Sequence, residues 1–171
     1  PIFVKPSIGG SSFATTKVKA ESDLVAAVDV AFGEASEVIV ESFIAGTEVT
    51  CGCYRIDDEM HTLPLTEVVS KNEFFDYNAK YEGASDEITP ARISPELTEK
   101  VQQLTKQIYA LVNAKGIIRA DFSISGQTPF LLEVNTTPGM TAASFIPQQV
   151  AAAGLSITEL LTAIIEEELK K

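Results

Sequence analysis

The 171-residue sequence has no tryptophan, one histidine and two cysteines, and this scarcity excludes several kinds of site. A structural zinc site needs four cysteine or histidine ligands, whereas Cys51, Cys53 and His61 are three. A C-x-C pair within one strand is also too strained to close a disulfide. We therefore interpret both cysteines as small buried residues of a protein in a reducing compartment, and His61 as a surface residue.

Positive charge is scarce as well, because 13 Lys and Arg face 24 Asp and Glu, for a net charge of −11. Nucleic acids and anionic membranes bind basic surfaces, so neither is an expected partner. No run of 18 apolar residues predicts a membrane span. The opening residues, Pro1–Pro6, do not resemble a signal peptide and begin within a predicted strand, which suggests a cytoplasmic piece of a longer chain.

Apolar residues make up 45 % of the chain, enough for a sizeable core, and helical and strand patterns occur in separate runs. This arrangement predicts the α+β class. A change in composition near residues 45–47 predicts two lobes, 1–45 and 46–171. Strands are expected over 2–5, 13–18, 37–44, 48–55, 62–69, 117–124 and 128–135. Helices are expected from Ser22 to Phe32, from Ser94–Pro95 towards Gly116, over a short segment ending at Ala153, and after Ser156.

The most informative pattern is a pair of polar residues in each of two neighbouring strands. Glu133 and Asn135 share one face of their strand, and Arg119 and Asp121 share one face of theirs. A three-residue loop, 125–127, would pair Ile124 with Thr128 and bring Arg119 opposite Glu133. Any odd loop length would keep all four polar groups on one face of the hairpin.

Carboxylate and amide oxygens suit Mg²⁺, which substrate phosphates usually share, and an arginine beside them suits a phosphate or an oxyanion. The alternative is a solvated polar face of an edge hairpin. A second candidate is the Gly- and Ser-rich loop 7–12, which could bind phosphate or form a plain hairpin tip. The aromatic-rich segment 72–83 could be an ordered functional loop or a loop pinned by its aromatic side chains.

Five motifs, in order, give a more specific indication. They are V-K-P with G-G-S-S, E-S-F-I-x-G-x-E, F-F-D-Y-N-A-K-Y, R-A-D-F, and L-L-E-V-N-T-T-P-G-M-T. In this order the chain resembles the D-alanine–D-alanine ligase family of ATP-grasp enzymes over its whole length. The resemblance implies two α+β lobes with largely antiparallel sheets, the second half of the central lobe in 1–45 and the C-terminal lobe in 46–171. The family's N-terminal domain, which helps to bind the first D-alanine, is absent from this sequence.

The resemblance also implies roles for individual residues. Lys5 and the loop residue Ser11 would contact the phosphates of ATP, and Glu48 the ribose. The adenine would be held by Glu41, Phe43 and Ile44. Two Mg²⁺ or Mn²⁺ ions would be bound by Asp121, Glu133 and Asn135. Arg119 and the backbone of Gly139 would stabilise the tetrahedral intermediate, Ser144 and Phe145 would hold the second D-alanine, and Lys80 and Tyr81 would lie on a mobile covering loop.

The implied reaction joins two D-alanines through an acyl phosphate, for peptidoglycan precursor synthesis, and the full-length enzyme would be a homodimer. Tyr81 favours D-alanine as the second substrate. The alternatives are a D-alanine–D-lactate or D-alanine–D-serine ligase, and a non-catalytic nucleotide-binding α+β module.

Overall fold

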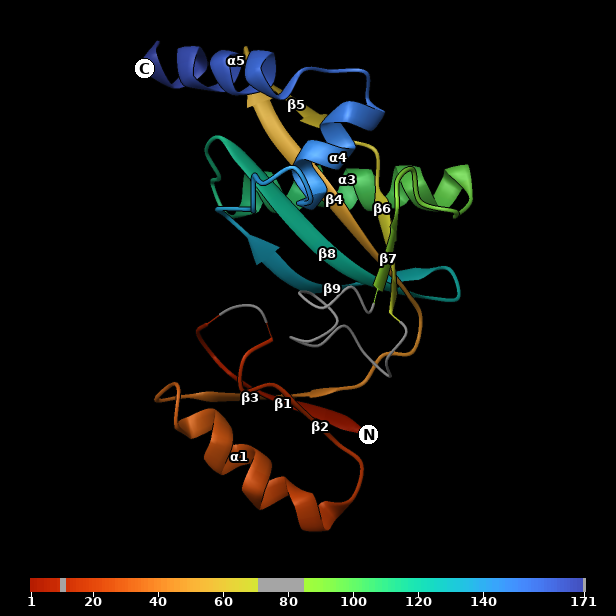
Figure 1. Cartoon of the computed structure of the whole chain (residues 1–171), viewed down its shortest axis with the longest axis vertical. Coiled ribbons are helices and arrows are strands. Elements are labelled where there is room, and N and C mark those ends of the chain that lie inside the picture. The colour runs from red at the N-terminus through yellow and green to blue at the C-terminus, as the bar shows by residue number, and fades with distance from the viewer. Residues whose placement is uncertain (10–11, 71–84, 171) are drawn as a thin grey trace. The chain divides into compact units, whose positions relative to one another are not determined.

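The computed structural model describes residues 1–9, 12–70 and 85–170, and the chain divides into two compact units (Figure 1). The first unit comprises Pro1–Ala45 with the described ends of Ser70–Asp86. The second comprises Gly46–Val69 and Glu87–Lys171. Both units combine antiparallel sheets with helices, which confirms the predicted α+β class.

The first unit is a three-stranded antiparallel sheet with one helix on one face. Strands β1 (Ile2–Pro6), β2 (Thr16–Val18) and β3 (Val38–Ser42) lie in the order β2-β1-β3. Helix α1 (Leu24–Phe32) follows a short 3-10 turn, η1 (Glu21–Asp23). Val4 and Val18 point from the sheet towards Ala27 and Ala31 of α1, and these four side chains form the core of the unit.

Two details of α1 differ from the prediction. Ser22 does not cap the helix but donates a hydrogen bond to Asp23, the N-cap residue. The 3-10 turn delays the start of the helix, whose buried residues are Ala27 and Ala31. Phe32, the last residue of α1, is 53 % exposed.

The second unit is built on a six-stranded antiparallel sheet. Its strands are β4 (Thr47–Ile56), β5 (Glu59–Thr62), β6 (Thr66–Ser70), β7 (Ser85–Ile88), β8 (Ile117–Ser125) and β9 (Thr128–Asn135). The order is β7-β6-β4-β8-β9, and β5 also pairs with β4. The single strand predicted over 62–69 is two strands, because Pro64 lacks an N–H group and interrupts the pairing.

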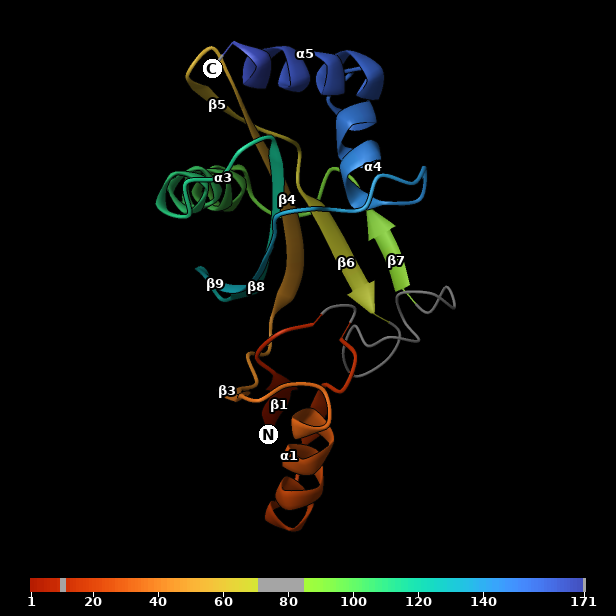
Figure 2. The same ribbon diagram turned by 90° about the vertical axis from the view of Figure 1, so that its left-hand side faces the viewer.

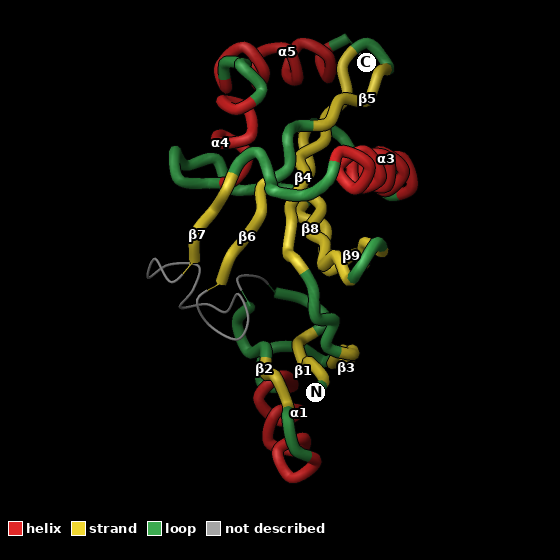
Figure 3. Tube along the Cα trace, turned by 90° about the vertical axis from the view of Figure 1, so that its right-hand side faces the viewer, coloured by secondary structure: helices red, strands yellow, loops and turns green. Residues whose placement is uncertain are grey.

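Helices cover both faces of this sheet, as Figures 2 and 3 show from opposite sides. On one face, α3 (Pro95–Leu111) packs through Leu97 and Val101 against Cys51, Ala120 and other alternate residues of β4 and β8. On the opposite face, α4 (Phe145–Ala152) and α5 (Ile157–Leu169) pack against a separate apolar cluster. That cluster contains Tyr54, Leu63, Ile117, Ile146, Val150, Leu160 and Ile164.

The starts of α3 and α5 were predicted correctly, but the end of α3 was not. Ser94 and Ser156 cap α3 and α5 as predicted, each accepting a hydrogen bond from the backbone N–H three residues on. However, α3 ends at Leu111, which is 85 % exposed, and does not continue towards Gly116. Two apolar residues of α5, Ile165 and Leu169, are also exposed.

No single helix among the described residues is long and apolar enough to cross a membrane, although α4 and α5, bent by 103° at their junction, reach that length and composition together.

The capping bond of Ser94 is directly testable. Replacing Ser94 with Ala removes the acceptor for Leu97 N–H and should lower the free energy of unfolding by about 1 kcal/mol. Ser94→Asp keeps an acceptor and should stay within about 0.5 kcal/mol of the parent chain. Urea denaturation measures both; equal losses in the two variants would contradict the capping role.

Candidate functional site

The face of the second sheet that α3 does not cover carries a cluster of polar side chains from β8 and β9. Arg119 and Asp121 alternate with Ala120 and Phe122, which face α3, so the two polar side chains point to the opposite side. Asn135 lies directly opposite Arg119 in the ladder. The hairpin thus brings all four predicted polar residues together, with Glu133 directly opposite Asp121.

The way this register arises differs from the prediction. Ser125 pairs with Thr128, so the β8–β9 turn has two residues, Gly126 and Gln127, rather than three. An even loop alone would place Glu133 on the face that α3 covers. Instead, the pairing shifts between Asp121 and Phe122: Phe122 pairs with Leu131 and Asp121 with Glu133, leaving Leu132 as an extra residue. This β-bulge returns Glu133 to the side of Asp121. The predicted pairing of Arg119 with Glu133 was therefore wrong.

Arg119 is the cation that holds the two carboxylates together. Its Nε and Nη2 atoms donate to the two oxygens of Asp121, each at 2.8 Å, and Nη2 lies 3.8 Å from Glu133 Oε1. The side chains of Arg119 and Asp121 are 13 % and 19 % exposed, and that of Glu133 is 50 % exposed. Burial lowers the pKa of Arg119, but the hydrogen bonds and charge of Asp121, with Glu133 and Glu87, outweigh it, so the pKa is raised.

Asn135 completes the cluster. Its amide nitrogen donates to Asp121 Oδ2 at 3.2 Å and to Glu133 Oε1 at 3.3 Å. The same side chain can offer its carbonyl oxygen to a cation by turning its amide group over. Two carboxylates and one amide oxygen, on paired strands, form a donor set that fits Mg²⁺ or Mn²⁺.

This donor set is an incomplete cage, which affects how a metal could bind. Over residues 1–9, 12–70 and 85–170, no group of three or more His, Cys, Asp or Glu side chains could hold a metal ion. A hexacoordinate ion here would take its remaining ligands from water or from a ligand's oxygens, which is the usual way Mg²⁺ is bound beside phosphates.

Two further segments of the second unit border the cluster. On β4, Glu48 is the ladder partner of Ser123 and lies on the same face as Asp121, two residues along. After β9, Gly139 packs so closely on Ser144 that an added Cβ would lie 2.8 Å from Ser144 Oγ. Phe145, the first residue of α4, stacks on Arg119, whose Cζ lies 5.0 Å from the ring centroid.

The first unit carries its own polar and aromatic face, opposite α1. Lys5 donates to Glu41 at 2.7 Å, and Phe3 packs edge-on against Phe43, with ring centroids 5.9 Å apart. Lys17 was not predicted from the sequence as a site residue, yet its Nζ atom lies 3.7 Å from the centroid of the Phe43 ring. The alternation of strand residues could have predicted its position, because Lys17 precedes the buried Val18 and therefore points away from α1. Ile44 is the second residue after the end of β3.

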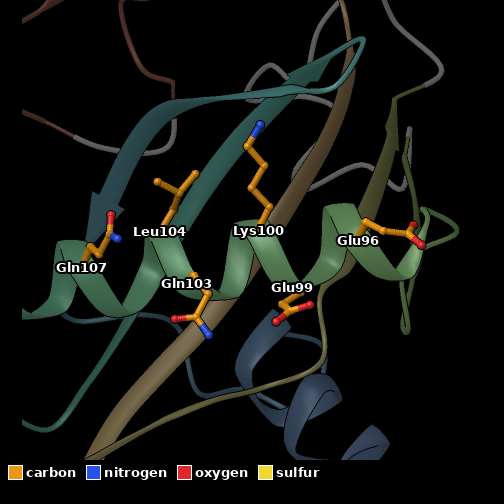
Figure 4. A pocket seen from close by; sticks show the side chains of 6 residues that line it. All are labelled: Glu96, Glu99, Lys100, Gln103, Leu104 and Gln107. Carbon is orange, nitrogen blue, oxygen red and sulfur yellow. The ribbon is translucent and has the colours of Figure 1, made fainter.

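Three predicted site residues, Ser11, Lys80 and Tyr81, lie outside the described residues. A shallow hollow elsewhere, along α3, contains none of the candidate groups (Figure 4). Its six side chains all come from that one helix, and Lys100 reaches from it to donate to Gln127 O at 2.8 Å. The hollow therefore lies on the α3 side of the sheet, away from Arg119 and Asp121.

Comparison with known proteins gives one consistent relationship. A family model described as D-ala D-ala ligase C-terminus matches residues 1–166. A D-alanine–D-alanine ligase from Parabacteroides distasonis is 62 % identical over 99 % of this chain, and one from Bacteroides fragilis is 59 % identical over 98 %. The chain spans about half the length of these curated relatives, 52 % of each.

Solved structures with the same fold include two ligases. The VanG D-Ala:D-Ser ligase from Enterococcus faecalis superposes with a TM-score of 0.85 at 36 % identity, covering 97 % of this chain and 49 % of that one. A D-alanine–D-alanine ligase from Bacillus anthracis complexed with ATP gives 0.77 at 28 % identity, covering 99 % and 51 %.

The arrangement around Arg119 predicts a response to Mg²⁺ in this chain itself. Arg119→Met leaves the carboxylates of Asp121 and Glu133 facing each other without their cation, and should lower the free energy of unfolding by about 2 kcal/mol. Added Mg²⁺ should restore part of this loss, raising the melting temperature of the variant more than that of the parent chain.

Arg92→Met is the matched control. Arg92 also makes a two-bond pair, with both Glu67 oxygens at 2.9 Å, but none of the Asp121 cluster contributes to it. Its melting temperature should respond to Mg²⁺ as the parent chain does. Equal responses of the Arg119 and Arg92 variants would contradict a cation site at Asp121 and Glu133.

Proposed function

Because the chain belongs to the D-alanine–D-alanine ligase family, we propose that it is the ATP-binding C-terminal part of an enzyme that joins two D-alanines. The observation that carries the proposal is the convergence of Asp121, Glu133, Asn135 and Arg119 on one face of the second sheet. Two carboxylates beside an arginine suit phosphoryl transfer, where charge must be neutralised on several oxygens at once.

In the proposed reaction, a carboxylate oxygen of the first D-alanine attacks the γ-phosphorus of ATP. ADP leaves, and an acyl phosphate forms. The amine of the second D-alanine then attacks the acyl carbon, inorganic phosphate leaves with the bonding electron pair, and the nitrogen loses a proton. When bound by Asp121, Glu133 and Asn135, Mg²⁺ would supply neutralisation of the phosphate charge.

The residues of the chain have separate tasks in this proposal. Lys5 binds the phosphates of ATP. In the structure its ammonium group pairs with Glu41, but this ion pair is partly exposed and therefore weak, so a bound nucleotide would replace Glu41 as the partner of Lys5. Glu41, Phe43 and Ile44 hold the adenine, and Glu48 the ribose.

Arg119 stabilises the oxyanion of the tetrahedral intermediate together with the backbone N–H of Gly139. Two of the five N–H donors of Arg119 point at Asp121, which leaves others for the substrate oxygen. Ser144 and Phe145, beside Arg119, bind the second D-alanine. The roles of Ser11, Lys80 and Tyr81, the cytoplasmic location and the homodimeric full-length enzyme stay predictions.

A second candidate has one observation in its favour, the similarity to a D-Ala:D-Ser ligase. It would use the same first step and a different acceptor in the second. The D-alanine–D-alanine assignment is favoured by the relatives of that name, which reach 62 % identity against 36 % for the D-Ala:D-Ser structure. Product analysis of the full-length enzyme, offered D-alanine, D-serine and D-lactate together, separates the candidates.

The chain alone should form no dipeptide from D-alanine and ATP, because it spans 52 % of the Parabacteroides distasonis relative, and the N-terminal domain that the family resemblance implies for binding the first D-alanine is not in this sequence. Phosphate release and chromatography of the products measure this. Turnover by the chain at a rate near that of the full-length enzyme would contradict the proposal.

Glu133→Gln in the full-length enzyme should lower dipeptide formation by about 100-fold, because one metal-binding carboxylate is lost. Glu99→Gln is the control: Glu99 lies on α3 (Figure 4), which packs on the opposite face of the sheet, and its loss should leave the rate unchanged. Full activity and unchanged Mg²⁺-dependent ATP binding in the Glu133 variant would favour a non-catalytic nucleotide-binding module.

A further inference from the structure

The edge of β4 that faces β5 and β6 has a break in its pairing. Thr50 pairs with Thr66 of β6, and Cys53 pairs with Thr62 of β5. Between these pairs the neighbouring chain runs through residues 63–65, where Leu63 donates to Gly52 O at 2.9 Å and Pro64 has no N–H to give. The backbone near Gly52 therefore needs hydrogen-bond partners from outside the strand ladder.

A side chain of α4 fills this break. Gln149 is completely buried, its Oε1 accepts from Gly52 N–H at 3.0 Å, and its Nε2 donates to Thr50 O at 3.0 Å. The same nitrogen donates to the Thr66 hydroxyl at 3.2 Å. One side-chain amide thus binds a backbone donor and a backbone acceptor of β4, as a peptide group of a neighbouring strand would.

Side chains of α4 lie in direct contact with the backbone of β4 at Gly52. A Cβ on Gly52 would lie 2.8 Å from Ile146 Cδ1 and 2.9 Å from Gln149 Oε1, so the helix is packed directly on the strand. Ile146 is itself fully buried. The glycine permits the close contact, and Gln149 fixes its register through directional hydrogen bonds.

The residues that Gln149 binds are neighbours of the candidate site. Thr50 is the ladder partner of Asp121, and Gly52 is the partner of Arg119. Gln149 also lies one helical turn after Phe145, the residue that stacks on Arg119. The same hydrogen bonds therefore connect the strand that supports Arg119 with the helix turn that carries Phe145.

We propose that Gln149 is a positioning residue for the second half-reaction, holding the first turn of α4 in place against Arg119. This inference rests on the proposed function, because it assigns Ser144 and Phe145 to the second D-alanine. Gln149 acts through α4 and does not touch the substrate. Loss of its hydrogen bonds affects the binding of the second D-alanine and leaves ATP binding unchanged.

The test uses the full-length enzyme with Gln149→Met, which keeps the length of the side chain and removes its polar atoms. We expect the Michaelis constant for the second D-alanine to rise roughly tenfold, since small misplacements of binding groups are costly. The Michaelis constant for ATP should stay within about twofold, since α4 carries no group assigned to the nucleotide.

Val150→Ala is the matched control. Val150 is the next residue of α4 and is also buried, but it is apolar and makes no side-chain hydrogen bond. It should lower the melting temperature without changing the Michaelis constant for the second D-alanine. If both variants change that constant equally, or if Gln149→Met leaves it unchanged, the positioning role is wrong.

Two further measurements cover the remaining outcomes. If Gln149→Met does not fold, Thr66→Val removes one of the three partners of Gln149 and should give a smaller rise of the same constant. No rise in that folded variant would overturn the proposal.

Hydrogen exchange at the Gly52 amide, which needs no substrate, should accelerate in Gln149→Met and not in Val150→Ala. If the unaltered enzyme forms no dipeptide, the proposed function fails, while this exchange difference still tests the contact.

Discussion

The structure of the second unit depends on keeping two carboxylates, Asp121 and Glu133, directly opposite each other on paired strands. Such a pair of like charges is destabilising unless a cation offsets it. Arg119 does so here, with two hydrogen bonds to Asp121 and a longer contact with Glu133, and Asn135 donates to both. The cluster holds two negative charges against one positive charge, which leaves it suited to a further cation.

The rest of the unit keeps this cluster accessible. The apolar alternate residues of β4 and β8 are covered by α3, so the polar ones are left for the other face. There α4 covers the sheet through Ile146 and Val150 while its first residue, Phe145, stays beside Arg119. The close contact of α4 with β4 requires a glycine at position 52, and the side-chain amide of Gln149 fixes the position of α4 along β4.

Local patterns in the sequence predicted the parts of the fold that local forces determine. Ser94 before Pro95 specified the start of α3, and alternation placed Arg119 with Asp121 and Glu133 with Asn135. The common face of the two pairs was predicted from an odd loop. In the structure it results from an even turn combined with an extra residue at Leu132, and nothing in the local pattern of two adjacent leucines distinguishes a bulge from a regular strand.

Features that depend on tertiary contacts were missed. Leu111 and Leu169 fit a helical stripe yet are exposed, because a stripe does not specify where the neighbouring sheet ends. Gln149 is an ordinary polar helical residue in the sequence. The ladder is interrupted around Pro64, between β5 and β6, which leaves backbone groups of Gly52 and Thr50 on β4 to be bound by Gln149. These residues lie 97 and 99 positions before Gln149, so no local pattern could have identified its burial.

The central claim is that Asp121, Glu133 and Asn135 bind a divalent cation together with ATP. The most direct measurement is the anomalous scattering of Mn²⁺ in crystals of the full-length enzyme with a non-hydrolysable ATP analogue. The account predicts two Mn²⁺ peaks, which between them lie within roughly 2.5 Å of oxygens from all three side chains, with the Asn135 amide oxygen turned towards a metal ion. A fully bound nucleotide whose Mn²⁺ lies away from these residues would contradict it.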